Sequence, residues 1–260
     1  MSRRARRLPT ARQLQLEGVL LAGGLRALLL QLAQPAVGHG VAEHSAFETD
    51  PLARLWGTLR FVYVVAAGDE ELVHRVARSV GRAHRPVVSG PDAAVEYDAR
   101  DPALQFWVAA TIHDTALRIA EAVWGPLPLP LADELLERMG RIATVLGLPA
   151  SDWPRTRAAF DAAFAAAAVD LRFDEQTLDV VRALVAARAT PRWIRLAMPA
   201  YLRATLSTLP ALRPELARFE GGPDLLPLAL RMAPLTRFLP HRLRTLPARR
   251  ILAAARAALD

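Results

Sequence analysis

The chain of 260 residues is 52% hydrophobic, with 33 basic and 26 acidic side chains and a formal net charge of +7. It is long and apolar enough to bury a substantial core, which excludes a disordered protein. It has no cysteine, which excludes disulfides, thiolate metal sites and a cysteine nucleophile. All the basic residues are arginines, which excludes Schiff-base chemistry and a P-loop lysine. Because the arginines are mixed with carboxylates, we interpret the charge as surface composition and expect no nucleic-acid partner.

The N-terminal residues 1–15 are predicted to form a basic tail, with an arginine cluster at residues 3–7. The apolar run that follows, 16–37, is interrupted by charged and amide side chains, and no small-residue cleavage site closes it. A membrane span needs about 20 residues with few or no charges. We therefore expect a core or amphipathic helix here, in a cytoplasmic protein with a possible peripheral membrane contact.

Helical spacing dominates the rest of the chain. Strand signals are scarce, whereas apolar residues recur three and four positions apart between proline and glycine stops. Asp101-Pro102 is typical of a helix start, and Gly147 is typical of a helix stop. The sequence predicts helices over 13–33, 51–67, 69–84, 101–124, 129–146, 155–168, 174–188, 191–206, 212–219, 224–236 and 246–259.

The proline-rich stretch 125–130 is the one candidate domain boundary. It is short, and hydrophobic stripes continue on both of its sides, so we interpret it as a rigid connector. Residues 16–260 are therefore predicted to form a single all-α, multi-helix domain. A boundary near 125–130 is the alternative.

The histidines form no zinc-binding pair of the His-x-x-x-His type. His39 and His44 are five residues apart, so on a helix they diverge by about 140° and do not share a ligand face. We interpret His113 as a core histidine bonded to a backbone carbonyl. Its neighbour Asp114 lies four residues before Arg118, which predicts an ion pair within the helix.

Arg54 and Thr58 lie one turn apart on the predicted helix 51–67, and His84 ends the predicted helix 69–84. Side chains four residues apart share a helix face. An imidazole that faces such donors from another helix is a common way for a bundle to hold a haem iron. The alternative is a partly exposed histidine that stabilises the C-terminal helix dipole.

Several stretches in a fixed order resemble one known family: residues 25–37 (LRALLLQLAQPAV), 40–45 (GVAEHS), 50–58 (DPLARLWGT), 80–87 (VGRAHRPV) and 97–111 (YDARDPALQFWVAAT). From about residue 17 to about residue 210 the chain resembles the catalytic domain of rubber oxygenase (latex clearing protein) and of MpaB-type oxygenases. The resemblance implies an all-α domain with a globin-like helical core and one b-type haem. It also implies oxygen-dependent oxidation, which in characterised relatives cleaves isoprenoid double bonds.

The resemblance further implies roles for three residues. His84 matches the proximal iron ligand, and Arg54 and Thr58 match distal residues that hydrogen-bond to oxygen. The implied cofactor is haem b, with O2 as co-substrate, and the implied partner is a small apolar substrate. Four apolar side chains could shape the substrate cavity, although core packing is the favoured interpretation: Leu55, Phe61, Phe106 and Trp107.

The chain departs from this family at three positions. Gly57 stands where relatives have a lysine or arginine, and Gln34 and Ala109 stand where relatives often have a histidine. His113, one turn after Ala109 on the same face, is a candidate substitute. These departures keep a second hypothesis open: a haem-free or catalytically degraded helical protein that binds lipid or a protein partner.

Overall fold

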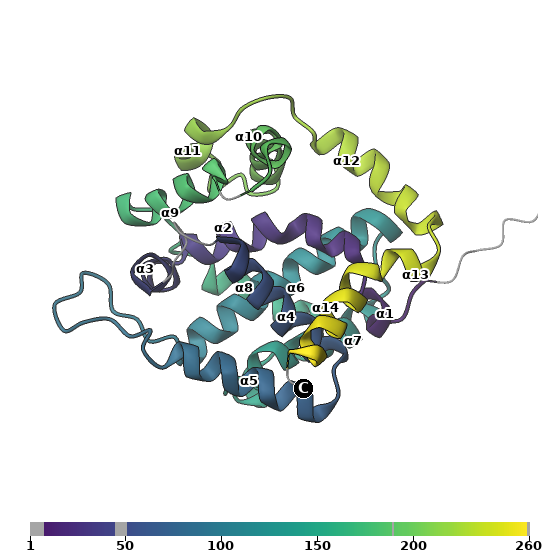
Figure 1. Cartoon of the computed structure of the whole chain (residues 1–260), viewed down its shortest axis with the longest axis horizontal. Coiled ribbons are helices and arrows are strands. Elements are labelled where there is room, and N and C mark those ends of the chain that lie inside the picture. Colours follow the sequence, from purple (N-terminus) through teal and green to yellow (C-terminus); the bar gives the residue numbers. More distant parts are fainter. Residues whose placement is uncertain (1–7, 45–50, 189, 259–260) are drawn as a thin grey trace, which may run out of the picture.

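The computed structural model of the chain describes residues 8–44, 51–188 and 190–258, and for residues 51–55 the backbone alone. In this part of the chain the fold is a single all-α domain, as the sequence predicts (Figure 1). Its β pairing is limited there to an isolated bridge between Val88 and Asp98. The globin-like arrangement of the helices stays a prediction.

Most helices follow one another with short connections, and a long loop of residues 85–101 joins α5 to α6. Four short segments are 3-10 helices: η1 (Gly18–Gly23), η2 (Ala150–Asp152), η3 (Ala217–Phe219) and η4 (Ala233–Phe238). The α-helices are α1 (Ala11–Leu14), α2 (Gly24–Ala33), α3 (Pro35–His44), α4 (Pro51–Ala67), α5 (Glu70–His84), α6 (Pro102–Trp124), α7 (Leu129–Thr144), α8 (Arg157–Ala167), α9 (Glu175–Ala186), α10 (Arg192–Leu206), α11 (Arg213–Leu216), α12 (Leu226–Met232), α13 (His241–Arg244) and α14 (Leu246–Ala257).

The N-terminal region differs from the continuous helix predicted over 13–33. Glu17 is extended (φ −68°, ψ 123°) and separates α1 from η1. Gly18 allows a close approach there, because a Cβ at this position would lie 2.9 Å from the carbonyl oxygen of Arg244. A second break at Gln34 (φ −79°, ψ 116°) precedes Pro35, which starts α3, a helix that was not predicted. The predicted basic tail lies partly outside the described residues, and its last turn, α1, packs on α7.

Two later helix starts have side-chain caps, and the one at Asp101 was predicted. Asp69 caps α5 by accepting a hydrogen bond from the Leu72 N–H (2.9 Å). Asp101 caps α6 by accepting one from the Ala103 N–H (2.7 Å), and Pro102 occupies the first helical position. Local sequence signals are therefore sufficient to fix where these two helices begin.

The core surrounds α6, which packs against α2 and against α7. One hydrophobic cluster joins α4, α5, α6, α7 and α8 through residues such as Val64, Val73 and Leu136. A second cluster joins α2, α9 and α10, and Phe164 of α8 contacts both clusters. Helices on both sides of the proline-rich connector thus contribute to the first cluster, and the alternative of a boundary near 125–130 is not supported.

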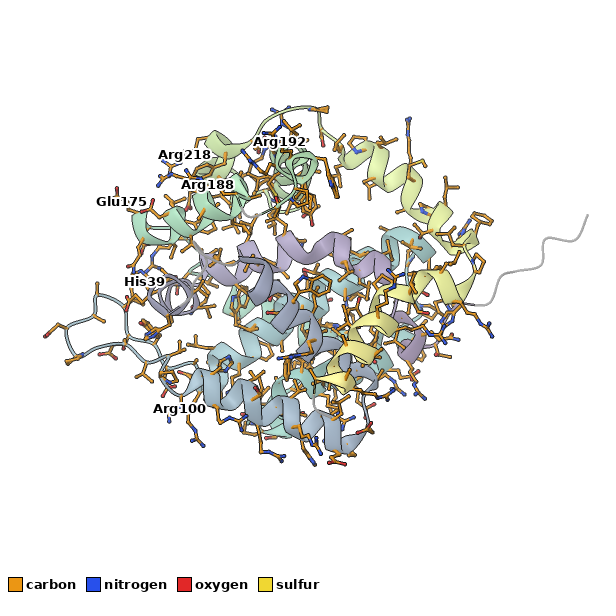
Figure 2. All side chains as sticks on the ribbon, in the orientation of Figure 1. His39, Arg100, Glu175, Arg188, Arg192 and Arg218 are labelled. Carbon is orange, nitrogen blue, oxygen red and sulfur yellow. The ribbon has the colours of Figure 1, made fainter. Side chains whose placement is uncertain are left out.

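Charged side chains cover the periphery. Figure 2 shows the labelled guanidinium groups of Arg100, Arg188, Arg192 and Arg218 at the outer edge of the molecule. Among the described residues, no single helix has the length and apolar composition of a membrane span. The segments 18–33 and 35–44 meet that test only together, and they are bent by 101° at their junction.

Candidate functional site

The predicted site residues lie on two consecutive antiparallel helices. α4 and α5 are separated by two residues and pack against each other (Figure 1). At 1.5 Å per residue, Arg54 on α4 and His84 on α5 each lie about 20 Å from this connection, and Thr58 lies one turn closer to it. The hairpin therefore carries all three positions toward its open end. The side chain of Arg54 is outside the described part.

The side chains of His84 and Thr58 both reach solvent. His84 is half-buried at the last position of α5, and Thr58 is exposed on α4. The carbonyl oxygen of His84 accepts a hydrogen bond from the Val87 N–H (3.0 Å), and the Val87 carbonyl accepts one from Ala99 (2.9 Å). The end of α5 is thereby tied to the loop that leads to α6.

A polar network holds this loop against α3. The Tyr97 hydroxyl donates to Glu43 Oε2 (2.6 Å) and lies 3.0 Å from His44 Nε2. Burial, together with the neighbouring Glu43 carboxylate, raises the pKa of Tyr97 to about 12. Gly40 makes room for the ring, because a Cβ there would lie 3.3 Å from Tyr97 and 3.5 Å from Val87. α3 and the segment after His84 are therefore in direct contact.

The same network continues to α9 through His39, which is buried on α3 (Figure 2). His39 Nε2 lies 2.5 Å from Asp174 Oδ2, and its Nδ1 lies 3.8 Å from Glu43 Oε1. Burial alone would raise the pKa of Asp174, but hydrogen bonds from Thr177 and His39 outweigh it and lower the pKa to about 2. His39 and His44 thus have separate partners, as their predicted divergence requires.

Sequence reasoning missed most of this network. The motif GVAEHS contains Glu43 and His44, but Tyr97 and Asp174 lie 54 and 131 residues from Glu43 in sequence. No local spacing connects positions so far apart. In the described residues, no group of three or more histidine, cysteine or acidic side chains is placed to hold a metal ion.

His113 lies in the core, as predicted, but without the predicted backbone partner. Its ring is fully buried, and neither ring nitrogen has a hydrogen-bond partner among the described residues. The ring packs edge-to-face on Phe160 (4.6 Å between centroids) and lies 6.5 Å from Trp153. Burial lowers its pKa to about 4. The imidazole is therefore neutral near pH 7 and sealed from solvent.

The ion pair predicted between Asp114 and Arg118 is confirmed, with 3.0 Å between carboxylate and guanidinium. The structure adds a second partner, because Arg26 of α2 lies 2.6 Å from Asp114 and donates to the Thr115 hydroxyl (2.9 Å). The side chains of Arg26 and Asp114 are both more than 90% buried. The pair therefore fastens α2 to α6 inside the protein.

The predicted packing role is confirmed for two of the four apolar residues. Phe61 and Trp107 are buried, and the Trp107 ring stacks on Phe164 at 5.2 Å and donates to the Leu30 carbonyl (3.2 Å). Phe106 is half-buried against the core. The side chain of Leu55 lies outside the described part.

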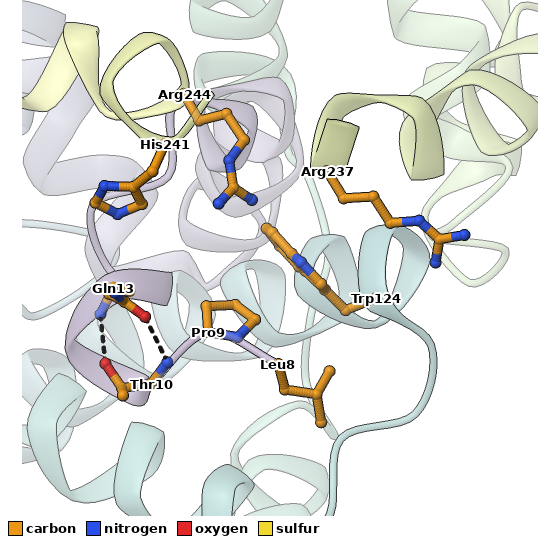
Figure 3. Close-up of a pocket in the computed structure, with 8 residues that line it drawn as sticks. All are labelled: Leu8, Pro9, Thr10, Gln13, Trp124, Arg237, His241 and Arg244. Atoms are coloured by element: carbon orange, nitrogen blue, oxygen red, sulfur yellow. Dashed lines mark hydrogen bonds between the residues drawn. The ribbon is translucent and has the colours of Figure 1, made fainter. Parts of the chain in front are cut away.

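Two of the hollows on the surface of the described structure are large enough for a small molecule. One, of about 650 Å³, lies between Trp124 and the basic side chains of His241 and Arg244 (Figure 3). Arg244 already has two partners there. Its Nη1 lies 3.2 Å from Oε1 of the buried Glu17, and its guanidinium lies over the Trp124 ring. The other, of about 770 Å³, lies between α4 and α14 and includes Gly57 in its wall. His84 lines neither hollow.

The donor set at the end of the hairpin fits a haem in chemical kind. Haem iron takes a single imidazole as its protein ligand in many proteins, and distal donors then control the bound gas. His84 is half-buried at a helix end, on the helix antiparallel to the one that carries Arg54 and Thr58. The fit concerns residue types and positions along the hairpin.

Comparison with known proteins identifies the family. Two uncharacterized mycobacterial proteins, Mb2261 of Mycobacterium bovis and Rv2237 of Mycobacterium tuberculosis, are each 32% identical over 187 residues. The alignment covers 70% of this chain and 73% of each relative. No solved structure gives a significant match. The family model described as ER-bound oxygenase mpaB/B'/rubber oxygenase, catalytic domain, matches residues 11–258, and the chain therefore belongs to this oxygenase family.

Proposed function

We propose that the protein is a haem b-dependent oxygenase that uses O2 to oxidise a small apolar, isoprenoid-like substrate. In this proposal His84 binds the iron, and Arg54 and Thr58 act on the opposite side. The observation that carries the proposal is the α4–α5 hairpin of an oxygenase-family domain, which carries all three positions toward one end. The haem supplies the oxygen chemistry when it is bound.

The side chains of this chain provide binding and polarity around that reaction. The Arg54 guanidinium and the Thr58 hydroxyl are hydrogen-bond donors, and donors aimed at developing negative charge stabilise it. The Tyr97–Glu43 hydrogen bond holds the segment that follows His84 against α3. Tyr97 and Glu43 are thus positioning residues for the end of α5.

The test is the absorption spectrum of the purified full chain titrated with haem. We expect one equivalent of haem to bind with a Soret band, and His84→Ala to abolish or strongly alter that band. His74→Ala is the matched control, because His74 is exposed on the same helix. Absence of stoichiometric haem binding by the wild-type protein contradicts the proposal, as does a His84→Ala spectrum identical to that of the wild type.

A second proposal concerns location: a cytoplasmic protein that touches a membrane surface through residues 226–246, here named the C-terminal arch. The arch includes α12, η4 and α13 at the periphery of the molecule (Figure 1). Its apolar side chains are unusually accessible, and those at least half exposed are Leu228, Leu230, Met232, Leu235, Phe238, Leu239 and Leu243. Contiguous exposed apolar residues of this kind mark an interaction surface.

The charge of the arch favours an anionic membrane as its partner. Arginines at positions 231, 237 and 242 lie among the apolar residues, and the arch carries a single acidic neighbour at its start, Asp224. Basic and apolar side chains together favour binding to anionic lipid surfaces. Co-sedimentation with phosphatidylglycerol vesicles tests this. Binding should weaken with salt and with Leu235→Ser/Phe238→Ser but not with Leu129→Ser, an exposed leucine of α7. Absence of vesicle binding contradicts the proposal.

A further inference from the structure

We propose that the groove between α4 and α14 binds an amphiphile made of a long apolar chain and a carboxylate head. The groove encloses about 770 Å³, which falls within the range of about 300–1,000 Å³ typical of small-molecule sites. Binding in this groove needs no haem. That the bound amphiphile is the molecule to be oxidised rests on the function proposed above.

The floor of the groove is apolar. It is formed by Leu59 of α4 and Leu21 of η1, which pack against the cluster that contains Ile251 of α14, and by Pro247. Trp56 forms part of the wall and is 57% exposed, so its indole offers a large apolar face to a ligand in the groove. An alkyl or isoprenyl chain laid along this floor would cover the exposed Trp56 ring and the apolar side chains beside it.

The charge of the groove selects the head group. Arg60 and Arg250 both line the groove, one from each helix, and no acidic residue lines it. Both guanidinium groups are exposed, and neither has a carboxylate partner among the described residues. Many other arginines on the protein surface have a carboxylate partner, such as Arg138 of α7 with Glu134 (3.1 Å). Two unpaired guanidinium groups beside an apolar floor complement a carboxylate at the end of an apolar chain.

Gly57 keeps the groove open on the α4 side. A Cβ at this position would meet no atom within 4 Å, although the residue lies within a helix and glycine is unfavourable there. A larger side chain would therefore project into the groove without displacing a neighbour.

The groove continues the surface proposed to lie on a membrane. Leu246 is the last residue of the C-terminal arch and also lines the groove, and it is 37% exposed. A membrane-derived amphiphile could therefore pass from the lipid surface into the groove without leaving apolar surroundings. This continuity favours a lipid-like chain over a water-soluble anion.

The experiment measures binding of doxyl-labelled stearate through quenching of tryptophan fluorescence in the purified full chain. A nitroxide label quenches the fluorescence of a tryptophan that it contacts. The difference in quenching between the wild type and Trp56→Phe is the part of the signal that comes from the groove. We expect saturable quenching of Trp56, and at least tenfold weaker binding in Gly57→Leu. If Gly57→Leu does not fold by circular dichroism, Ala254→Leu narrows the groove from α14, where residue 254 is exposed.

The head group is tested with charge variants. Arg60→Gln/Arg250→Gln should weaken stearate binding about three- to tenfold, since charge pairs exposed to solvent contribute only weakly to binding. The same double variant should leave binding of the stearate methyl ester unchanged. Arg78→Gln, at an exposed arginine on α5, is the matched control and should have no effect.

Three outcomes would overturn the inference: no quenching of Trp56, no effect of the groove variants, or an equal loss in Arg78→Gln, which would indicate nonspecific charge attraction. Haem titration of the same samples separates the two proposals. Haem binding through His84 without stearate binding overturns this inference alone. Stearate binding without haem binding overturns only the proposed oxygenase function.

Discussion

The helix α6 and the C-terminal arch use apolar residues in opposite ways. Along α6 even polar side chains are buried: His113 is completely enclosed, and Asp114 is sealed against Arg26 of α2. Along the arch, leucines and Phe238 are at least half exposed. The difference teaches that hydrophobicity alone does not locate the core of this chain. A residue belongs to the core when helices pack on both of its sides, as α2 and α7 do on α6.

The largest expected effect concerns the buried ion pair of α6. Asp114→Ala should destabilise the protein by about 3–5 kcal/mol, because it leaves the guanidinium of Arg26 buried without its partner. Urea unfolding measures the change. The double variant Arg26→Met/Asp114→Leu removes both charges and should recover most of this loss. A single variant as stable as the wild type would show that Arg26 is solvated or has another partner.

The second effect is a pH dependence that originates at His113. Its pKa is about 4 in the folded protein and near 6.5 in the unfolded chain, so between these values the unfolded state binds more protons. The free energy of unfolding should therefore fall by about 3 kcal/mol as the pH decreases from above 6.5 to 4. His113→Phe keeps an aromatic ring and should remove this part of the pH dependence. Equal slopes in variant and wild type would contradict a sealed neutral imidazole.

The third prediction compares two glycines inside helices. A Cβ at Gly140 of α7 would lie 2.4–2.7 Å from the Trp153 indole, so Gly140→Ala should destabilise by about 1–3 kcal/mol. Gly57→Ala meets no neighbour and should stabilise by up to about 1 kcal/mol through helix propensity. Thermal unfolding shows whether each variant is more or less stable than the wild type. If both changes are stabilising, the core around α6 and α7 is looser than these distances indicate.

Local features of the fold were predictable from the sequence, whereas pairs distant in sequence were not. The Asp101-Pro102 cap fixed the start of α6 because capping depends on adjacent residues. The end of the first predicted helix at residue 33 agrees with the end of α2. The break at Glu17 was missed because apolar residues continue on both sides of it, so the periodicity shows no interruption. The contact between Arg26 and Asp114 joins residues 88 positions apart, and no spacing rule reaches that far.

The candidate site shows the same division. The helical placement of Arg54, Thr58 and His84 followed from spacing, and the family followed from several motifs in order. The network around Tyr97 did not, since it depends on how α3, α9 and the loop before α6 meet in space. The groove between α4 and α14 could also not be predicted from the sequence, because the two helices that form it are almost 200 residues apart.

The smallest expected effect is in the C-terminal arch and sharpens the contrast with α6. Leu230 and Leu235 are each 50% exposed, so replacing either with glutamine removes little buried apolar surface. The free energy of unfolding should change by less than about 0.5 kcal/mol per substitution, as for ordinary surface positions. The same variants should weaken vesicle binding, because the two leucines are transferred from water into the lipid when the protein binds to the vesicle. Part of the arch, η4, already contacts α6. A loss above about 2 kcal/mol would therefore mean that Leu230 and Leu235 belong to the packed side of the arch and not to a lipid-binding surface.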